Sequence, residues 1–276
     1  MHEAAAGRVR RLSSATIIRD RAQLPGPVRA VPSGGPWLIP AAVAVIYLGS
    51  PASPWWALGA VGVLAAVAGA YVLVGDRGRA VFAAACVVAF APAIFGWSIA
   101  IPGIGAVLLV AYTLRMRGRR AVIGKTVPVT ATIVAAVVCA GVAVFQHVTL
   151  ASAAGTIGWT SLPGQNAGFP VVLIIVLAAS ATNATFEELL WRIGIDGLFT
   201  SRQHLLLRSV FISALFGLSH IHGTPSGVLG MTFAGLFGLS MCLVRDTSRG
   251  AVLWVIAAHF VADVILIGGA YGLFVW

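Results

Sequence analysis

Side chains in the last third of this chain could carry out acid–base chemistry on water. Glu187 and Glu188 end a long apolar run, and Asp263 lies inside another, four residues after His259. Carboxylates and imidazoles are the groups that most often transfer protons in catalysis. An acidic residue at the centre of a bilayer costs about 2.5–3.5 kcal/mol on the most lenient scale, so each is a candidate functional residue if these runs span a membrane.

The first cluster consists of Glu187, Glu188 and Arg192. Residues four apart share a helix face, so Glu188 and Arg192 can form an ion pair in the favourable order. Successive helical residues are rotated by about 100°, so Glu187 points away from that pair. We therefore expect Arg192 to neutralise Glu188 and Glu187 to act as a general base. The alternative is a helix end with solvated charges, since polar residues such as Asp196 resume here.

Two further clusters contain histidine. Phe216 and His220 share a helix face, and His220 lies deeper in its apolar run than His222, which we expect to face a loop. His259 and Asp263 are also four residues apart, so a carboxylate could fix the tautomer and orientation of the imidazole. The alternative for this last group is a buried pair that only pins two helices together.

The elements that position these residues are predicted to be transmembrane helices. Hydrophobic residues make up 59% of the 276 and charged residues only 9%, far from the composition of a soluble domain. We predict an all-α polytopic transmembrane bundle of eight or nine spans, with a catalytic core in the C-terminal half. Some apolar runs are short against the roughly 20 residues that a span needs. The runs lie at about 37–50, 55–75, 80–97, 99–114, 127–150, 169–191, 209–222, 226–244 and 251–273.

Three segments are expected along the chain: a basic leader at 1–35, N-terminal transmembrane helices at 36–150, and the catalytic core at 169–273. The leader shows no cleavable signal pattern. With a cytoplasmic N-terminus, nine spans place every later basic cluster on the same side, as the positive-inside rule expects. We therefore expect a multi-pass protein of the cell membrane. The later lysine and arginine residues fall at 77–79, 115–125, 192–208 and 245–249.

The net charge of +10 has a topological explanation. The basic residues are spread over loops without interleaved aromatic residues, which indicates contact with anionic lipid and not with nucleic acid. The three cysteines lie in different apolar runs without a CxxC spacing, so we expect packing roles for them. Small residues such as Gly59, Gly62 and Gly69 are expected to let helices approach closely.

Together the three clusters resemble a known family. The order EExxxR, FxxxH, HxxxD is similar to that of the CAAX-processing and bacteriocin-processing proteases, intramembrane glutamic proteases related to the Ras-converting CAAX endopeptidase. The resemblance extends over about residues 170–270. The residues that carry it are Glu187, Glu188, Arg192, Phe216, His220, His259 and Asp263.

The resemblance implies an intramembrane endopeptidase that hydrolyses a peptide bond in a membrane-associated peptide or protein. Glu187 would activate the attacking water, with Glu188 and Arg192 supporting it. His220 would help to bind and orient that water. No cofactor is implied, and the expected partners are the substrate and the lipid bilayer.

His259 and Asp263 would occupy the oxyanion side of the site. The eukaryotic members have asparagine where this chain has Asp263. An amide can donate a hydrogen bond to a developing oxyanion and an ionised carboxylate cannot. Asp263 must therefore either be protonated or serve mainly to orient His259.

Other classes of protein fit parts of the pattern. The same acidic and histidine residues form an acceptable ligand set for zinc or iron, giving a metal-dependent intramembrane hydrolase. Against this, HExxH is missing, and the pairing of Glu188 with Arg192 would remove one ligand. A transporter with a proton relay would be expected to show paired internal repeats, which we do not find. A non-catalytic scaffold that binds membrane proteins is the third alternative.

Overall fold

Helices make up all the regular structure in the described part of the chain. The computed structural model describes residues 35–48, 54–95, 100–117, 129–152, 167–199, 205–223, 227–248 and 251–273, and no strand occurs among them. The predicted leader at 1–35 lies outside the described residues except for its last residue. The predicted all-α class is confirmed.

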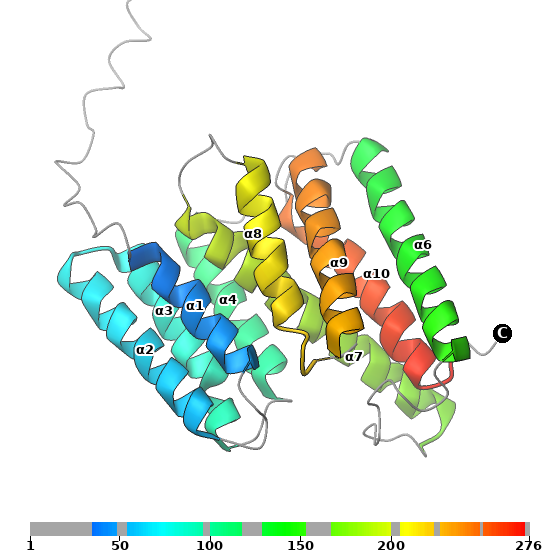
Figure 1. Ribbon diagram of the computed structural model, residues 1–276, viewed down its shortest axis with the longest axis horizontal. Coiled ribbons are helices and arrows are strands. Elements are labelled where there is room, and N and C mark those ends of the chain that lie inside the picture. The colour runs from blue at the N-terminus through cyan, green and yellow to red at the C-terminus, as the bar shows by residue number, and fades with distance from the viewer. Residues whose placement is uncertain are drawn as a thin grey trace, which may run out of the picture. The chain divides into compact units, whose positions relative to one another are not determined.

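Each of the nine predicted apolar runs overlaps an α-helix among the described residues (Figure 1), but α8 ends at Leu218, so His220 and His222 lie outside the helix that was predicted to carry them. The 3₁₀-helix η3 (Ala91–Phe95) continues α3, and the π-helix η4 (Leu189–Ile195) and the 3₁₀-helix η5 (Asp196–Leu198) continue α7. The α-helices are α1 (Gly35–Leu48), α2 (Pro54–Leu73), α3 (Arg77–Phe90), α4 (Ala100–Arg117), α6 (Val129–Ser152), α7 (Phe169–Glu188), α8 (Leu205–Leu218), α9 (Gly227–Thr247) and α10 (Val252–Ala270).

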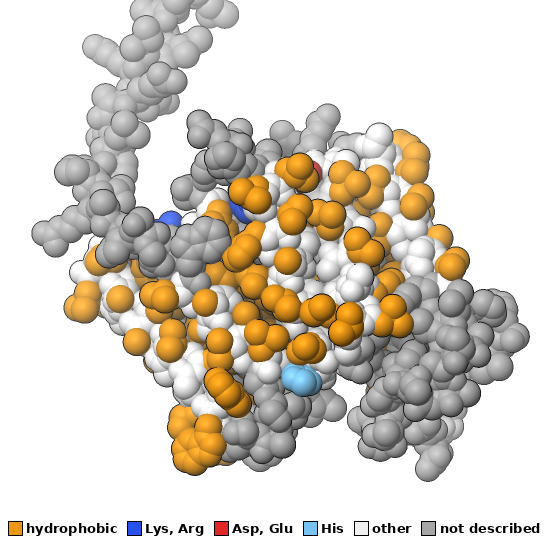
Figure 2. Space-filling model, viewed as in Figure 1, with side chains coloured by type: hydrophobic (Ala, Val, Ile, Leu, Met, Phe, Trp, Pro, Cys, Tyr) orange, Lys and Arg blue, Asp and Glu red, His pale blue; other side chains and the backbone are white. Residues whose placement is uncertain are grey.

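Several helices are long and apolar enough to cross a membrane. In the described ranges there are five such segments, and four further apolar helices are shorter. Hydrophobic side chains are spread over the face shown in Figure 2. Exposed leucines also follow α9, at Leu229, Leu236 and Leu243. Exposed apolar surface on this scale is a liability in water and is what a lipid-facing helix presents. The five segments are Trp55–Leu73, Arg77–Phe95, Phe169–Leu198, Gly227–Thr247 and Val252–Ala270.

Helix α7 is central to the packing around the candidate residues. It packs against α4 and α10, and α10 also packs against α6 and α9. Gly105 of α4 lies so close to α7 that an added Cβ would be 2.3 Å from the ring of Phe186, the residue before Glu187. The segment of α7 that carries Phe186 and Glu187 is therefore packed against both α4 and α10.

The glycines that permit close helix contacts differ from those predicted. Nothing lies within 4 Å of an added Cβ at Gly59, Gly62 or Gly69, so that prediction was wrong. Their helix, α2, presents these glycines outward, and spacing alone cannot tell which face is packed. A Cβ at Gly217 in α8 would instead lie 2.6 Å from the carbonyl oxygen of Met231 in α9. The backbones of α8 and α9 thus meet at Gly217.

Replacing Gly217 by alanine is expected to destabilise the protein by about 1–3 kcal/mol, because the new methyl group meets backbone that cannot rotate away. The measurement is the thermal unfolding midpoint in detergent. Gly62→Ala is the matched control, and it should retain stability or gain up to about 1 kcal/mol from helix propensity. Equal midpoints for Gly217→Ala and the wild type would contradict the close contact.

Candidate active site

Several polar contacts join α7 to α10, and two of them, one helical turn apart, show how the helices align. Glu187 lies opposite His259, and Asn183 lies opposite Asp263. Between the two contacts the residue number decreases by four in α7 and increases by four in α10. The two helices therefore run antiparallel here. The face of α7 that carries Asn183 and Glu187 therefore meets the face of α10 that carries the histidine and the aspartate.

His259 is the centre of this arrangement. Its Nδ1 lies 2.7 Å from Oε1 of Glu188, and it must donate this hydrogen bond if the carboxylate is ionised. Its Nε2 lies 3.5 Å from Oε2 of Glu187 and 3.5 Å from Oδ1 of Asp263. All four residues are buried. The structure thus brings both glutamates and the aspartate to one imidazole.

Arg192 contacts this cluster through Glu188. Its Nε lies 3.6 Å from Oε2 of Glu188, so the expected pairing of these two residues is present. Its Nη2 donates a hydrogen bond of 3.0 Å to the carbonyl oxygen of Gly238, and its guanidinium lies 5.2 Å from the centre of the Phe216 ring. Glu188 is therefore held by both Arg192 and His259, a second contact that the sequence did not predict.

A π-helix follows Glu188 directly. All seven residues of η4, including Arg192, are buried. An added Cβ at Gly194 would lie 2.1 Å from the ring of Phe82 in α3, so this segment is packed tightly against that helix. Short π-helical segments are rare and occur frequently at functional sites. No sequence signal predicted it.

His220 lies in the turn after α8, at the edge of the cluster. Its Nδ1 is 3.0 Å from the carbonyl oxygen of Phe216 and its ring is 4.8 Å from the Phe216 ring, which in turn lies 6.4 Å from the His259 ring. If Nδ1 donates to that carbonyl oxygen, Nε2 of the neutral ring carries a lone pair. Among the described residues no hydrogen bond joins His220 to Glu187. His222 is exposed, as expected.

Apolar side chains close the site around the imidazole. The ring of Phe237 in α9 lies 4.8 Å from the His259 ring, edge to face. Phe216 contributes a second aromatic wall, and its ring also lies 5.9 Å from that of Trp191. Walls of this kind exclude water, which strengthens the electrostatic interactions inside.

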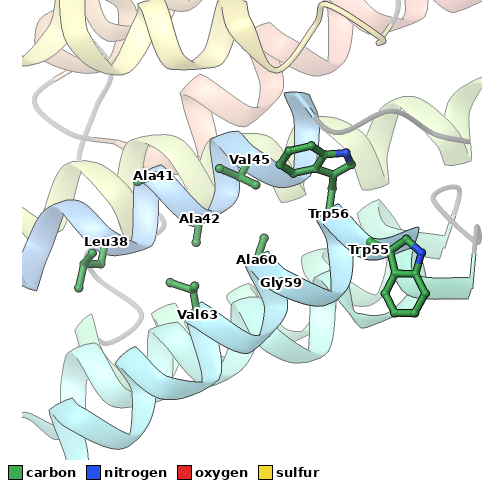
Figure 3. A pocket seen from close by; sticks show the side chains of 9 residues that line it. All are labelled: Leu38, Ala41, Ala42, Val45, Trp55, Trp56, Gly59, Ala60 and Val63. Atoms are coloured by element: carbon green, nitrogen blue, oxygen red, sulfur yellow. The ribbon is translucent and has the colours of Figure 1, made fainter. Parts of the chain in front are cut away.

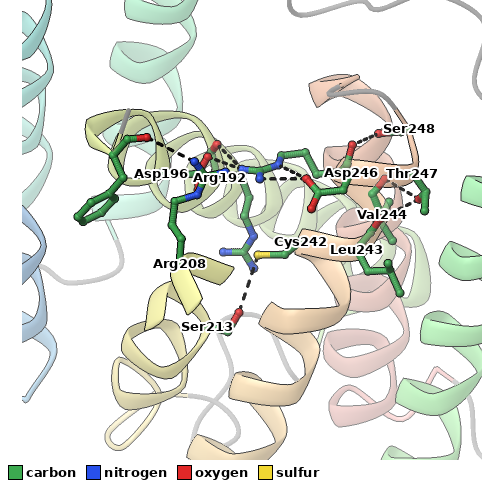
Figure 4. A network of polar contacts seen from close by, with 12 residues as sticks. Arg192, Asp196, Arg208, Ser213, Cys242, Leu243, Val244, Asp246, Thr247 and Ser248 are labelled. Atoms are coloured by element: carbon green, nitrogen blue, oxygen red, sulfur yellow. Dashed lines mark hydrogen bonds and ion pairs between the residues drawn. The ribbon is translucent and has the colours of Figure 1, made fainter. Parts of the chain in front are cut away.

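A second polar network lies beyond the π-helix (Figure 4). Asp196 accepts from Nη1 of Arg245 at 2.6 Å and pairs with Nε of Arg208 at 2.7 Å. Nη1 of Arg245 also donates to the carbonyl oxygen of Arg192 at 3.3 Å. The network connects the end of the π-helix to α8 and α9. The sequence had indicated only that polar residues resume here.

The residues weighed as metal ligands are in contact with one another and with Arg192. In the described part of the chain, no group of three or more His, Cys, Asp or Glu residues is placed to hold a metal ion. Glu188, one of the residues considered as a metal ligand, contacts Arg192 and His259.

An apolar groove lies apart from the candidate site, between α1 and α2 (Figure 3). Its volume is about 610 Å³, and it contains no titratable side chain. The groove therefore offers no acid–base group of its own. The groove is lined by Leu38, Ala41, Ala42, Val45, Trp55, Trp56, Gly59, Ala60 and Val63.

The fold and the site define a polytopic helical membrane protein with a buried cluster of carboxylates and imidazole. Residues 169–265 match the family model described as Type II CAAX prenyl endopeptidase Rce1-like. The matched segment begins with α7 and contains all three motifs, so the family resemblance predicted from those motifs is confirmed over this segment. Over this segment, the chain is similar to the CAAX-type endopeptidase family. No curated protein and no solved structure gave a significant match.

Proposed function

We propose that this protein is an intramembrane endopeptidase that hydrolyses a peptide bond in a membrane-associated peptide or protein, using water activated by Glu187. The observation that carries the proposal is the contact of one buried imidazole, His259, with Glu187 and Glu188. A carboxylate next to a fixed imidazole combines a proton acceptor with a donor to developing negative charge. The reaction needs no metal or other cofactor.

In the proposed reaction, one hydrogen of the water is donated to Glu187 and the other to the lone pair on Nε2 of His220. Glu187 takes its proton as the water oxygen attacks the carbonyl carbon, so a tetrahedral intermediate forms without a covalent enzyme adduct. In the imidazolium form, His259 donates from Nδ1 to Glu188, and it shares its single Nε2–H between Oδ1 of Asp263 and the oxyanion. Glu187 then returns its proton to the leaving amine as the C–N bond breaks.

The placement of the basic residues supports a cytoplasmic N-terminus in the cell membrane. Arg79 contacts the carbonyl oxygen of Leu198 at 3.5 Å, and Arg208 and Arg245 both pair with Asp196. Basic residues from three parts of the chain thus meet at one end of the bundle, in agreement with the positive-inside rule. Glu187 lies one π-helix away from this end, so the substrate would be cleaved near the cytoplasmic surface.

The test is cleavage of a membrane-tethered peptide by the purified full-length protein in liposomes. We expect cleavage that persists after treatment with EDTA and 1,10-phenanthroline, because Glu187 itself activates the water. Loss of activity on chelation, restored by a stoichiometric metal, would support the metal-dependent alternative. A folded protein that cleaves none of a broad set of tethered peptides would favour the scaffold.

A further inference from the structure

Asn183 contacts the candidate site although no motif includes it. Its Nδ2 donates a hydrogen bond of 3.1 Å to Oδ2 of Asp263, while Oδ1 of the same carboxylate lies 3.5 Å from Nε2 of His259. Asn183 is one helical turn before Glu187, so both side chains project from the same face of α7. The two oxygens of Asp263 are thus divided between the two helices.

This division constrains how Asp263 can act. A spacing of four residues places Asp263 near His259 but leaves its side-chain torsions free, and several rotamers are available to an aspartate. The amide N–H of Asn183 can only donate, so the Asp263 oxygen that it contacts, Oδ2, must accept. The other oxygen, Oδ1, then faces the imidazole. Asp263 accepts the hydrogen bond from Asn183 and turns its other oxygen toward the imidazole, which suits a residue that orients His259.

We propose that Asn183 is a positioning residue, which clamps the Asp263 carboxylate so that its other oxygen orients His259. The kinetic consequence rests on the proposed endopeptidase function. The hydrogen bond itself does not, so the two can be tested separately.

The experiment uses the full-length protein in liposomes and the tethered peptide. Asn183→Ala is expected to lower kcat by about 10- to 100-fold with little change in KM, as is typical for a partner that orients a reacting group. The matched control is Thr182→Ala, because the neighbouring Thr182 is exposed and bonds only to carbonyl oxygens of its own helix. The control should retain the kcat of the wild type.

A swap of the two side chains distinguishes pairing from simple packing. Asn183→Asp places two carboxylates in contact and should lower kcat further than Asn183→Ala, because like charges in a buried site repel. Adding Asp263→Asn restores an amide–carboxylate pair with reversed polarity, and should raise kcat about tenfold or more over Asn183→Asp alone. Wild-type kcat in Asn183→Ala, or no recovery in the double variant, would overturn the proposal.

The same variants separate this inference from the proposed function. If the wild type cleaves no substrate, the endopeptidase proposal fails, but the thermal midpoints of the two single variants and the double variant still report the pair. Asn183→Asp should lower the midpoint and Asp263→Asn should restore it. If the change in thermal midpoint of the double variant equals the sum of the changes in the two single variants, the proposed pairing of Asn183 with Asp263 is overturned, whatever the activity.

Discussion

Replacing Glu187 by glutamine is expected to lower kcat by about 10³-fold, within the range that general-base catalysis contributes. The amide keeps the size of the side chain but cannot accept the proton of the attacking water. Oε2 of Glu187 lies 3.5 Å from Nε2 of His259, and no guanidinium neutralises it among the described residues. The measurement is kcat on the tethered peptide, together with the thermal midpoint.

The control for this substitution is Asp246→Asn, which also converts an acid to its amide. The Asp246 side chain is 47% exposed and pairs with Arg245 outside the site, so activity should be unchanged. Loss of activity in Glu187→Gln with an unchanged midpoint supports its role as the base. Full activity in Glu187→Gln would end that assignment.

Replacing Arg192 by leucine is expected to destabilise the protein by about 3–5 kcal/mol, the cost of leaving a buried charge without its partner. The side chains of Arg192 and Glu188 are each only 1% exposed, so water cannot replace the lost guanidinium. Activity should fall as well, because Glu188 also holds His259. The measurement is the free energy of unfolding in mixed micelles.

The double variant Arg192→Leu/Glu188→Gln tests the reason for this loss. It removes both charges, so it should recover much of the stability that Arg192→Leu loses. Arg192→Lys should not recover it fully, because a lysine lacks the planar group that lies over Phe216 while donating to Gly238. A double variant that is no more stable than Arg192→Leu would show that the loss comes from packing and not from the unpaired carboxylate.

The local contacts of the site follow from sequence spacing. Glu188 and Arg192, and likewise His259 and Asp263, are pairs four residues apart, and the structure places each pair within 3.6 Å. A helix fixes such neighbours whatever surrounds it. The nine α-helices of the described residues could be predicted for a similar reason, because each lies in an apolar run of the sequence that is bounded by polar, glycine or proline residues.

The contacts between helices could not be predicted in this way. The prediction assigned the orientation of His259 to Asp263, but the shorter contact, 2.7 Å, comes from Glu188, 71 residues earlier in the chain. Asn183 was missed because its partner lies on another helix. The glycines of α2 were misread because nothing in their spacing says which face meets a neighbour.

The sequence by itself determined that this is a helical membrane protein, which acidic and histidine residues are candidates for the chemistry, and which of them are neighbours within a helix. Only the tertiary structure decided that α7 and α10 run antiparallel with Glu187 opposite His259 and Asn183 opposite Asp263. Helical periodicity is a local property, whereas the register between two helices depends on the shapes of all the side chains packed between them. That register separates the three buried acids into a proposed base at Glu187, a neutralised anchor at Glu188 and a clamped acceptor at Asp263.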